Sequence, residues 1–346
     1  MNHNKKIRDY GCNLGQSQTG INNSITDVPG VKVGHKTLDN GKIKTGVTVI
    51  MPHCGNMFKE KLIAASHVIN GFGKSAGLMQ IDELGTIETP IVLTNTLNVG
   101  VAHEAIVRYM LENNNDIGTS TGSVNPIVGE CNDGELNDIR GLYVSKEDIF
   151  EAIQNCDIAF LEGNVGAGTG MICYDLKGGI GSSSRIVKLG QTNFTVGVLV
   201  LSNFGSLEDF VIKGDPIGQR IKGLLPDNKT TEDKGSIVSI LATDIPLSSS
   251  QLKRVIKRIQ SGIARTGSYT GHSSGEVCVG FSTANKINHY EAKEIYSINI
   301  LNDDHINKIF KATVEATEEA VLNSMICSTT TIGRDNKKVY SLKDFL

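Results

Sequence analysis

The sequence predicts an α+β fold in which β-sheets form a sandwich that is covered by helices. At least five strand-like and five helix-like segments follow one another in mixed order, and no regular strand–helix repeat or internal sequence repeat is present. This order favours a mixed sandwich over a doubly wound parallel sheet. Hydrophobic residues make up 39% of the 346 residues, which is enough for a sizeable core. The length allows one large domain or two of ordinary size.

Five segments are typical of strands. Each is a short run rich in β-branched and other apolar residues, bounded by polar residues or glycine. The predicted strands are 45–53, 89–97, 193–203, 236–244 and 275–285.

Five other segments are typical of helices, because their apolar residues recur at helical spacing. Ser145 followed by Asp148 forms a pattern like a capping box, and serines stand at the start of another predicted helix. Asp303 and Asp304 lie at the positive end of the longest one. The predicted helices are 59–70, 101–115, 145–156, 247–266 and 302–328.

Three segments have no long periodic pattern. Residues 1–24 and 213–235 are polar and predict exposed connections. Residues 157–192 carry so many glycines that a long helix is excluded there. Short strands joined by tight turns, with backbone exposed to a cavity, fit this middle segment best.

Charge and cysteine content exclude several classes of protein. Lys and Arg number 34 against 37 Asp and Glu, so no basic surface for a nucleic acid is indicated. The seven cysteines are scattered without a C-x-x-C pair, which argues against a zinc site or a disulfide framework. The first 20 residues lack the apolar run of a signal peptide, and no stretch approaches the ~18 apolar residues of a membrane span. We expect a reduced, cytoplasmic protein without metal, cofactor or membrane partner.

Two glycine-rich runs resemble nucleotide-binding loops but lack the required context. Residues 71–77 (GFGKSAG) have Val68 where a phosphate loop needs its first glycine, and the segment before them is predicted as a helix. Residues 163–170 (GNVGAGTG) are followed by a β-like run with more glycines, not by a helix. A turn-rich wall near an active site explains this second run better. His103-Glu104 begins a zinc-protease pattern, but Val107 stands where the second histidine is needed.

The junction at Lys234-Gly235-Ser236 suggests a chemistry of its own. A charged connection meets a buried strand there, and cleavage before Ser236 would place a new α-amino group beside a hydroxyl. An α-amine with a pKa of ~7.7–8.0 is partly neutral near pH 7.5, so it can accept the hydroxyl proton. Nucleophile and general base would then belong to one residue. No credible Ser/His/Asp pattern competes with this interpretation.

Nearly the whole chain resembles the DmpA-type L-aminopeptidase/D-esterase family, which includes β-peptidyl aminopeptidases. The glycine-rich and Gly-Ser runs carry the most specific part of this resemblance. The matching stretches are 25–35, 89–100, 133–141, 162–185, 235–254, 273–285 and 315–335.

The resemblance implies a four-layer αββα sandwich of the N-terminal-nucleophile type, related to ornithine acetyltransferase. It also implies one domain, residues 1–346, that cleaves itself between Gly235 and Ser236 into an α chain (1–235) and a β chain (236–346). These chains stay together, and we expect a homo-oligomer of processed units. A small peptide, amide or ester is the implied substrate.

Several site residues follow from the same resemblance. Ser236 would be nucleophile and new N-terminus, and Asn203 would stabilise the oxyanion. Ser274 and Glu276 would orient the nucleophile and its amine. Glu130 would receive the substrate ammonium group, with Asp133 as its main rival. Lys177, in the matching K-G-G-I-G run, would support the site.

One position departs from the family pattern. Asn132 stands where some relatives carry an aromatic residue that contributes a hydroxyl or a stacking wall. Asn132 is therefore a candidate substrate-binding residue, with the second oxyanion donor and the substrate preference left open.

Two other functions compete with a self-processing aminopeptidase. One is an endo-acting amidase like the related nylon-oligomer hydrolases, which share the fold and use Thr as nucleophile; Ser236 favours the aminopeptidase. The other is a non-catalytic ligand-binding protein that uses residues 163–181. An uncleaved chain would favour this last alternative.

Overall fold

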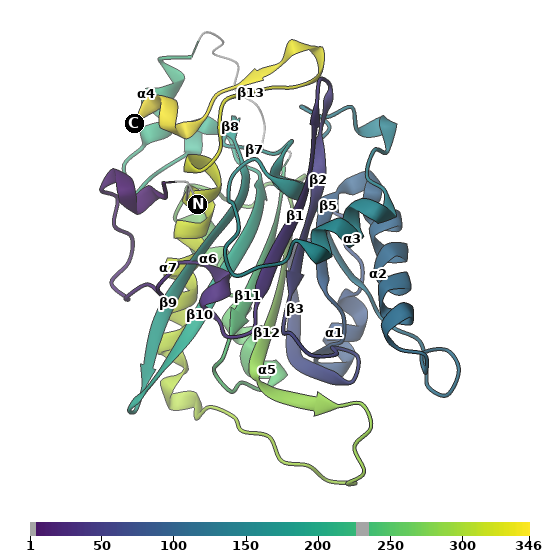
Figure 1. Cartoon of the computed structure of the whole chain (residues 1–346). Helices are drawn as coiled ribbons and strands as arrows, with labels where there is room; N and C mark the ends of the chain where they lie inside the picture. The colour runs from purple at the N-terminus through teal and green to yellow at the C-terminus, as the bar shows by residue number, and fades with distance from the viewer. Residues whose placement is uncertain (1–4, 226–234) are drawn as a thin grey trace.

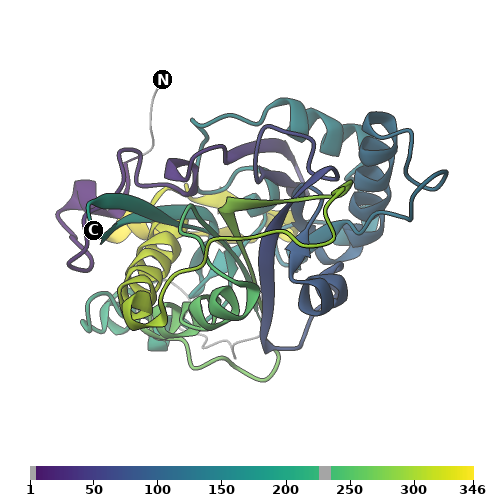
Figure 2. The same cartoon turned by 90° about the horizontal axis from the view of Figure 1, so that it is seen from below.

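Two β-sheets pack face to face between two layers of helices in the computed structural model, which describes residues 5–225 and 235–346 (Figure 1). Seen from below, the helices occupy the two outer sides and the strands lie between them (Figure 2). The predicted αββα sandwich is therefore confirmed. No helix within the described ranges has the length and apolar character that crossing a membrane requires.

The larger sheet has six strands in the order β4-β3-β12-β11-β10-β9. Neighbours are antiparallel except β11 and β12, which run parallel. The strands are β3 (Glu60–Asn70), β4 (Thr86–Ile87), β9 (Gly179–Leu189), β10 (Thr192–Asn203), β11 (Ser236–Thr243) and β12 (Gly275–Asn288).

The smaller sheet has the order β1-β2-β5-β6, with only β5 and β6 parallel. Its strands are β1 (Lys32–Asn40), β2 (Ile43–Met51), β5 (Ile91–Asn95) and β6 (Ile127–Cys131). Two short ribbons complete the described strands: β7 (Ile172–Cys173) with β8 (Leu176–Lys177), and β13 (Thr331–Ile332) with β14 (Lys338–Val339).

Helices cover the outer face of each sheet. The six-stranded sheet is covered by α5 (Ser249–Ile256), α6 (Ile259–Ala264) and α7 (Ile306–Ile326). The four-stranded sheet is covered by α2 (Val99–Asn113) and α3 (Lys146–Gln154). Two short helices, α1 (Leu78–Leu84) and α4 (Ile217–Lys222), lie in connections.

Side chains alternate between the two faces of each central strand, as the pleat requires. In β11, Val238 and Ile240 point into the core between the sheets, whereas Ile237 and Leu241 pack in the core beneath the helices. In β10, Leu199 and the other odd-numbered positions nearby face the same inter-sheet core. This alternation fixes which side chains meet at the strand ends.

All five predicted strands are confirmed, as β2, β5, β10, β11 and β12. The predicted helices 101–115 and 145–156 are α2 and α3. Ser145 caps α3 in a capping box with Asp148, as its spacing predicts.

The prediction of a helix at 59–70 is wrong, because these residues form β3. Both faces of β3 are buried: Leu62 and Ala64 face the other sheet, and Ala65 packs on the helix side. A strand buried on both faces has a continuous apolar run that is not distinguishable from a buried helix by periodicity.

Three further boundaries differ from prediction. The segment 247–266 is two helices, because α5 packs on β3 and β12 whereas α6 packs on α7. The connection 213–235 contains α4, whose Ile217 and Ile221 are buried one turn apart; residues 226–234 of this connection lie outside the described ranges. The glycine-rich segment includes the eleven-residue strand β9.

The helix predicted at 302–328 is α7, but its second half is enclosed on all sides. Residues 5–24 pack over it, which a single apolar face does not predict. Arg8 Nε lies 2.7 Å from Glu319 Oε1, and the Gln16 and Ser17 amides donate to the Glu315 carboxylate.

Candidate active site

Three strand ends meet at one edge of the six-stranded sheet. Ser236, the first residue of β11, pairs with Asn203, the last residue of β10, and with Gly275, the first residue of β12. Because β11 and β12 are parallel while β10 runs the opposite way, residues that lie 33 and 39 positions from Ser236 in the sequence converge on it here. The sequence prediction of a buried strand beginning at Ser236 is thus correct.

The Ser236 hydroxyl points into the space between the sheets, on the face shared with Val238. The side chain is 6% exposed, and its oxygen makes no hydrogen bond of ordinary geometry with the described residues. The Cys131 thiol of β6 is its polar neighbour: burial raises the thiol pKa, and the Ser236 hydroxyl lowers it in part. Burying a hydroxyl without a hydrogen-bond partner costs free energy, so this arrangement calls for a functional explanation.

Gly235 leaves no space for a side chain. A Cβ at this position would overlap the Asn203 carbonyl oxygen and the Phe204 Cα. The Gly235 carbonyl accepts a hydrogen bond from the Gly275 amide at 3.1 Å. The carbonyl next to Ser236 is therefore hydrogen-bonded to the start of β12, while the Cα of Gly235 lies tightly against the end of β10.

Asn203 has a fixed amide orientation. Its Oδ1 accepts from the Ile172 amide at 2.9 Å, and its Nδ2 donates to the Asn132 carbonyl at 3.0 Å. Because Asn203 and Ser236 are directly paired, their side chains project from the same face of the sheet. One of the two Nδ2 hydrogens is used by Asn132, and the other remains for a further acceptor.

Lys177 lies behind Asn203 and does not contact Ser236 through any interaction that the structure records. Its ammonium group is fully buried and donates to the carbonyls of Gly168, Met171 and Gly178 at 2.7–3.1 Å. Burial lowers its pKa to about 7, while three acceptors match the three hydrogens of the charged form. Lys177 thus holds the backbone turn that presents the Ile172 amide to Asn203.

Ser274 and Glu276 form a buried pair at the start of β12. Ser274 Oγ donates to Glu276 Oε1 at 3.2 Å, and both residues are 0% exposed. In register, Glu276 pairs with Ile237, so its side chain lies on the helix-covered face, opposite to the Ser236 hydroxyl. Glu276 therefore reaches the start of β11 from the face opposite to the Ser236 hydroxyl.

Glu130 projects from the outward face of β6, since its neighbour Cys131 points into the inter-sheet core. Its Oε1 accepts from the Lys74 amide at 2.8 Å, and its Oε2 accepts from the Thr96 hydroxyl. The turn that binds it also contacts the other sheet, because a Cβ on Gly275 would meet the Phe72 carbonyl. The loop 72–74 therefore connects Glu130 with the strand next to Ser236.

Asn132 and Asp133 have structural contacts of their own. The Asn132 side chain accepts from the Gly134 amide at 2.9 Å, closing a turn. Asp133 is fully buried, accepts from Asn137 Nδ2 at 3.0 Å, and has its pKa raised by burial to about 6. Glu130, and not Asp133, is thus the carboxylate beside the loop that reaches Gly275.

The glycine-rich runs pack against protein backbone. Glycines 163, 168 and 179 approach each other so closely that side chains there would overlap neighbouring backbone atoms. In the 71–77 run the Lys74 amide is bound to the Glu130 carboxylate, where a phosphate loop would need free amides. The segment before this run is a strand, which corrects the helix expected there, but Val68 still replaces the first glycine.

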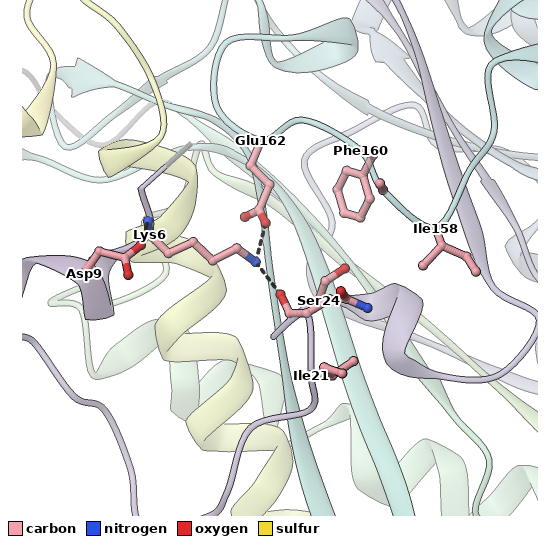
Figure 3. A pocket seen from close by; sticks show the side chains of 9 residues that line it. Lys6, Asp9, Ile21, Ser24, Ile158, Phe160 and Glu162 are labelled. Carbon is pink, nitrogen blue, oxygen red and sulfur yellow. Dashed lines mark hydrogen bonds and ion pairs between the residues drawn. The ribbon is translucent and has the colours of Figure 1, made fainter. Parts of the chain in front are cut away.

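A pocket of about 250 Å³ lies away from these strand ends, beneath the N-terminal segment (Figure 3). Lys6 Nζ is 2.6 Å from Glu162 Oε1 and donates to the Asn23 carbonyl at 2.7 Å. Burial raises the pKa of Glu162, and Lys6 lowers it in part. Lys6 and Glu162 are thus paired with each other, and they tie the N-terminal segment to the segment before β9.

Within residues 5–225 and 235–346, no group of three or more His, Cys, Asp and Glu side chains is arranged to hold a metal ion. The seven cysteines all lie in these ranges and are free thiols.

Residues 23–339 match the model of peptidase family S58. The chain belongs to this family. Among curated S58 relatives, the β-peptidyl aminopeptidase BapA of Sphingosinicella xenopeptidilytica is 37% identical over 97% of this chain and 88% of its own length. BapA of Sphingosinicella microcystinivorans is 35% identical over 95% of this chain.

Solved structures agree with this assignment. A Pyrococcus horikoshii OT3 protein is 52% identical with a TM-score of 0.94, and the two chains are covered to 98% and 96%. A Burkholderia sp. β-aminopeptidase is 37% identical with a TM-score of 0.89, covering 98% of this chain and 96% of its own. The Ochrobactrum anthropi L-aminopeptidase D-Ala-esterase/amidase, described as a variant of the Ntn hydrolase fold, is 35% identical with a TM-score of 0.89, covering 97% and 95%. This S58 protein is therefore a hydrolase with an Ntn-type aminopeptidase fold.

Sequence reasoning missed several groups around the S58 site. Thr96, the Lys74 amide and the Ile172 amide bind Glu130 or Asn203, and Thr270 Oγ1 donates to Glu276 Oε2 at 3.1 Å. Backbone amides leave no trace in residue identity, and threonines are too common to single out. The one signal near these groups that the sequence does show is Gly271, directly after Thr270, because glycine is common in turns.

Proposed function

We propose that this S58 protein is a self-processing serine aminopeptidase that releases N-terminal residues from small peptides, amides or esters through an acyl-Ser236 intermediate. The pairing of Asn203 with Ser236 on one face of the sheet is the observation that carries the proposal. It gives an unpartnered buried hydroxyl a neighbouring amide donor at the place where an oxyanion would form.

Self-processing begins with attack of Ser236 Oγ on the Gly235 carbonyl carbon. The Gly235–Ser236 C–N bond breaks, the hydroxyl proton passes to the leaving nitrogen, and an ester joins Gly235 to Ser236. Water then hydrolyses the ester and leaves Gly235 as a carboxylate and Ser236 with a free α-amine. The close fit of Gly235 between β10 and β12 favours this step, because it holds the carbonyl in place.

The new α-amine acts as general base in turnover. It accepts the Ser236 hydroxyl proton directly or through one water while Oγ attacks the substrate carbonyl. Asn203 Nδ2 donates to the oxyanion, a contact typically worth about 3–4 kcal/mol of transition-state stabilisation. The α-ammonium returns the proton to the leaving amine, and water releases the acyl group.

The remaining site residues have supporting roles. Ser274 and Glu276 orient the α-amine from the helix-covered side of β12, and Lys177 holds the turn that orients Asn203. Glu130 pairs with the substrate ammonium group, so a free amino terminus is preferred over a blocked one. The backbone carbonyl of Asn132 accepts a hydrogen bond from Asn203 Nδ2 and so helps to orient the Asn203 amide.

We also expect processed units to form a homo-oligomer. The support is a run of exposed apolar side chains in the extended segment that follows β12, among them Ile295 (85% exposed) and Ile300 (58%). Exposed apolar patches on soluble proteins mark interaction surfaces. Light scattering of the processed protein tests this expectation; a monomeric αβ unit would contradict it.

Kinetics on matched amides test the function. Purified, processed protein should hydrolyse an aminoacyl p-nitroanilide with a free α-amine and leave its N-acetylated form nearly untouched. The Ser236→Ala variant should hydrolyse neither. Equal rates on both substrates would instead favour an endo-acting amidase, and no hydrolysis of either would favour the non-catalytic alternative.

A further inference from the structure

Thr270 has a backbone conformation that its side chain disfavours. Its φ is +60°, and among the described residues it is the only β-branched residue in the left-handed region. Such a conformation is uncommon for any residue with a Cβ and a genuine outlier for a β-branched one. Gly271, which adopts left-handed backbone at little cost, follows directly but does not take the positive φ.

The surrounding loop holds Thr270 in this state. The Thr270 amide donates to Ser268 Oγ at 3.1 Å. The Gly271 carbonyl accepts from the Ser274 amide at 2.9 Å and from Asn70 Nδ2 at 3.3 Å. Strained backbone persists where neighbouring contacts over-determine it, and such sites cluster around functional groups.

The strained conformation places the Thr270 hydroxyl on the carboxylate of the candidate site. Thr270 Oγ1 donates to Glu276 Oε2 at 3.1 Å, while Ser274 Oγ donates to Oε1 at 3.2 Å. Glu276 is 0% exposed, so a change in its rotamer would not be compensated by bulk water. One hydroxyl on each oxygen fixes the plane of the carboxylate.

We propose that Thr270 is a positioning residue of this aminopeptidase, which accepts backbone strain in order to fix the Glu276 carboxylate, the group proposed above to orient the Ser236 α-amine. The proposal rests on the proposed function of Ser236 and Glu276. Thr270 acts through Glu276 and has no contact with the substrate. Its loss should therefore lower kcat while KM, which depends on recognition by Glu130, changes little.

Three substitutions separate the hydroxyl from the strain. Thr270→Ser keeps the hydroxyl and eases the β-branched conflict, so its kcat should stay within about twofold of the original. Thr270→Val keeps the shape and removes the hydroxyl, so kcat should fall about tenfold. Thr270→Gly removes hydroxyl and strain together, so kcat should fall about tenfold while Tm falls less than in Thr270→Val.

A matched control removes similar strain elsewhere. Leu142 also has a positive φ, +49°, and is an exposed loop residue with no contact to the site. Leu142→Gly should leave kcat and KM unchanged. Each rate is divided by the processed fraction from intact mass, so that slow processing is not mistaken for slow turnover.

The measurement is kcat, KM and Tm for all four variants on a free-amine p-nitroanilide. The proposal is overturned if Thr270→Gly or Thr270→Val keeps the original kcat, or if Thr270→Ser loses as much kcat as Thr270→Val. It is also overturned if kcat follows Tm across the series, since that pattern describes a merely structural threonine. If the unmodified chain is neither processed nor active, the proposed function itself fails, and this inference fails with it.

Discussion

Asn203 and Ser236 are paired residue to residue across β10 and β11, the last position of one strand against the first of the next. Both side chains project into the space between the sheets, and the Asn203 amide is oriented by the Ile172 amide behind it. In the proposed mechanism this pair acts during turnover: Ser236 Oγ attacks the substrate carbonyl, and the Asn203 amide donates to the oxyanion that forms.

Gly235→Ala should slow self-processing at least tenfold. A methyl group at this position would overlap the Asn203 carbonyl oxygen and the Phe204 Cα, so the backbone at residue 235 must shift and displace the scissile carbonyl from its place beside the Gly275 amide. The readout is the fraction of cleaved chain by intact mass after timed expression. Gly223→Ala is the matched control and should be processed normally, because a Cβ there makes only an ordinary contact with the Arg220 carbonyl and the residue has no positive φ. Full processing of Gly235→Ala would show that the tight fit is irrelevant.

Lys177→Met should lower both stability and kcat. The substitution leaves the carbonyls of Gly168, Met171 and Gly178 without their donor, at a cost of about 2–3 kcal/mol in the free energy of unfolding. The turn that carries the Ile172 amide loosens, and Asn203 loses its orientation, so kcat should fall about tenfold. Lys253→Met, which removes a half-exposed ion pair with Asp82, should change stability by less than about 1 kcal/mol. Unchanged kcat in Lys177→Met would separate this lysine from the site.

Glu130→Gln should impair recognition of the free amine and not bond cleavage. The amide keeps the size of the side chain but loses the charge, so about 1–3 kcal/mol of interaction with the substrate ammonium disappears. The loss should appear in kcat/KM for free-amine amides and nearly vanish for their N-acetylated forms, while processing at Ser236 continues. If Glu130 only binds the Lys74 amide and the Thr96 hydroxyl, Tm falls and both substrates suffer alike.

The stability of the Asp133→Asn variant relative to the unsubstituted chain should increase as pH rises. Burial raises the pKa of Asp133 to about 6, against ~3.9 in an unfolded chain, so the folded state binds more protons between these values. The contribution of Asp133 to stability is therefore fully present below about pH 4 and lost as pH rises through about 6. Relative to the unsubstituted chain, Asp133→Asn should gain about 2–3 kcal/mol between pH 4 and 7.

Urea unfolding at several pH values, in an uncleaved Ser236→Ala background, measures this gain. Asp138→Asn supplies a control of opposite sign, because the Lys42 ammonium and the Tyr143 hydroxyl lower the pKa of Asp138. That variant should lose stability relative to its parent as pH rises through the range where Asp138 ionises. A pH-independent difference between Asp133→Asn and its parent would rule out the assigned titration.

Local pattern was enough to predict the strands that build the site. The change from a charged connection to an apolar run located the start of β11 at Ser236, and the apolar run 193–203 located β10. It failed at β3, where Leu62, Ala64 and Ala65 are buried from both sides and mimic a helix. It located the helix α7 but not the burial of its second half, since the packing of residues 5–24 over that half depends on the whole fold.

The site itself was accessible to sequence reasoning only in part. Hydroxyl and carboxylate side chains at Ser236, Ser274 and Glu276 could be named from the resemblance. The groups that orient the site residues could not be named from the sequence. The amides of Lys74 and Ile172 are backbone groups, and the positive φ of Thr270 is a property of the folded loop. The opposite orientation of Glu276 and the Ser236 hydroxyl follows from strand register, which no single segment specifies.

The intact mass of freshly purified protein tests the central claim most directly. The account predicts two fragments, residues 1–235 and 236–346, for the unmodified chain and a single uncleaved chain for Ser236→Ala. An unmodified chain that stays intact yet hydrolyses free-amine amides would contradict it, as would cleavage of Ser236→Ala between Gly235 and position 236 in protease-free preparations.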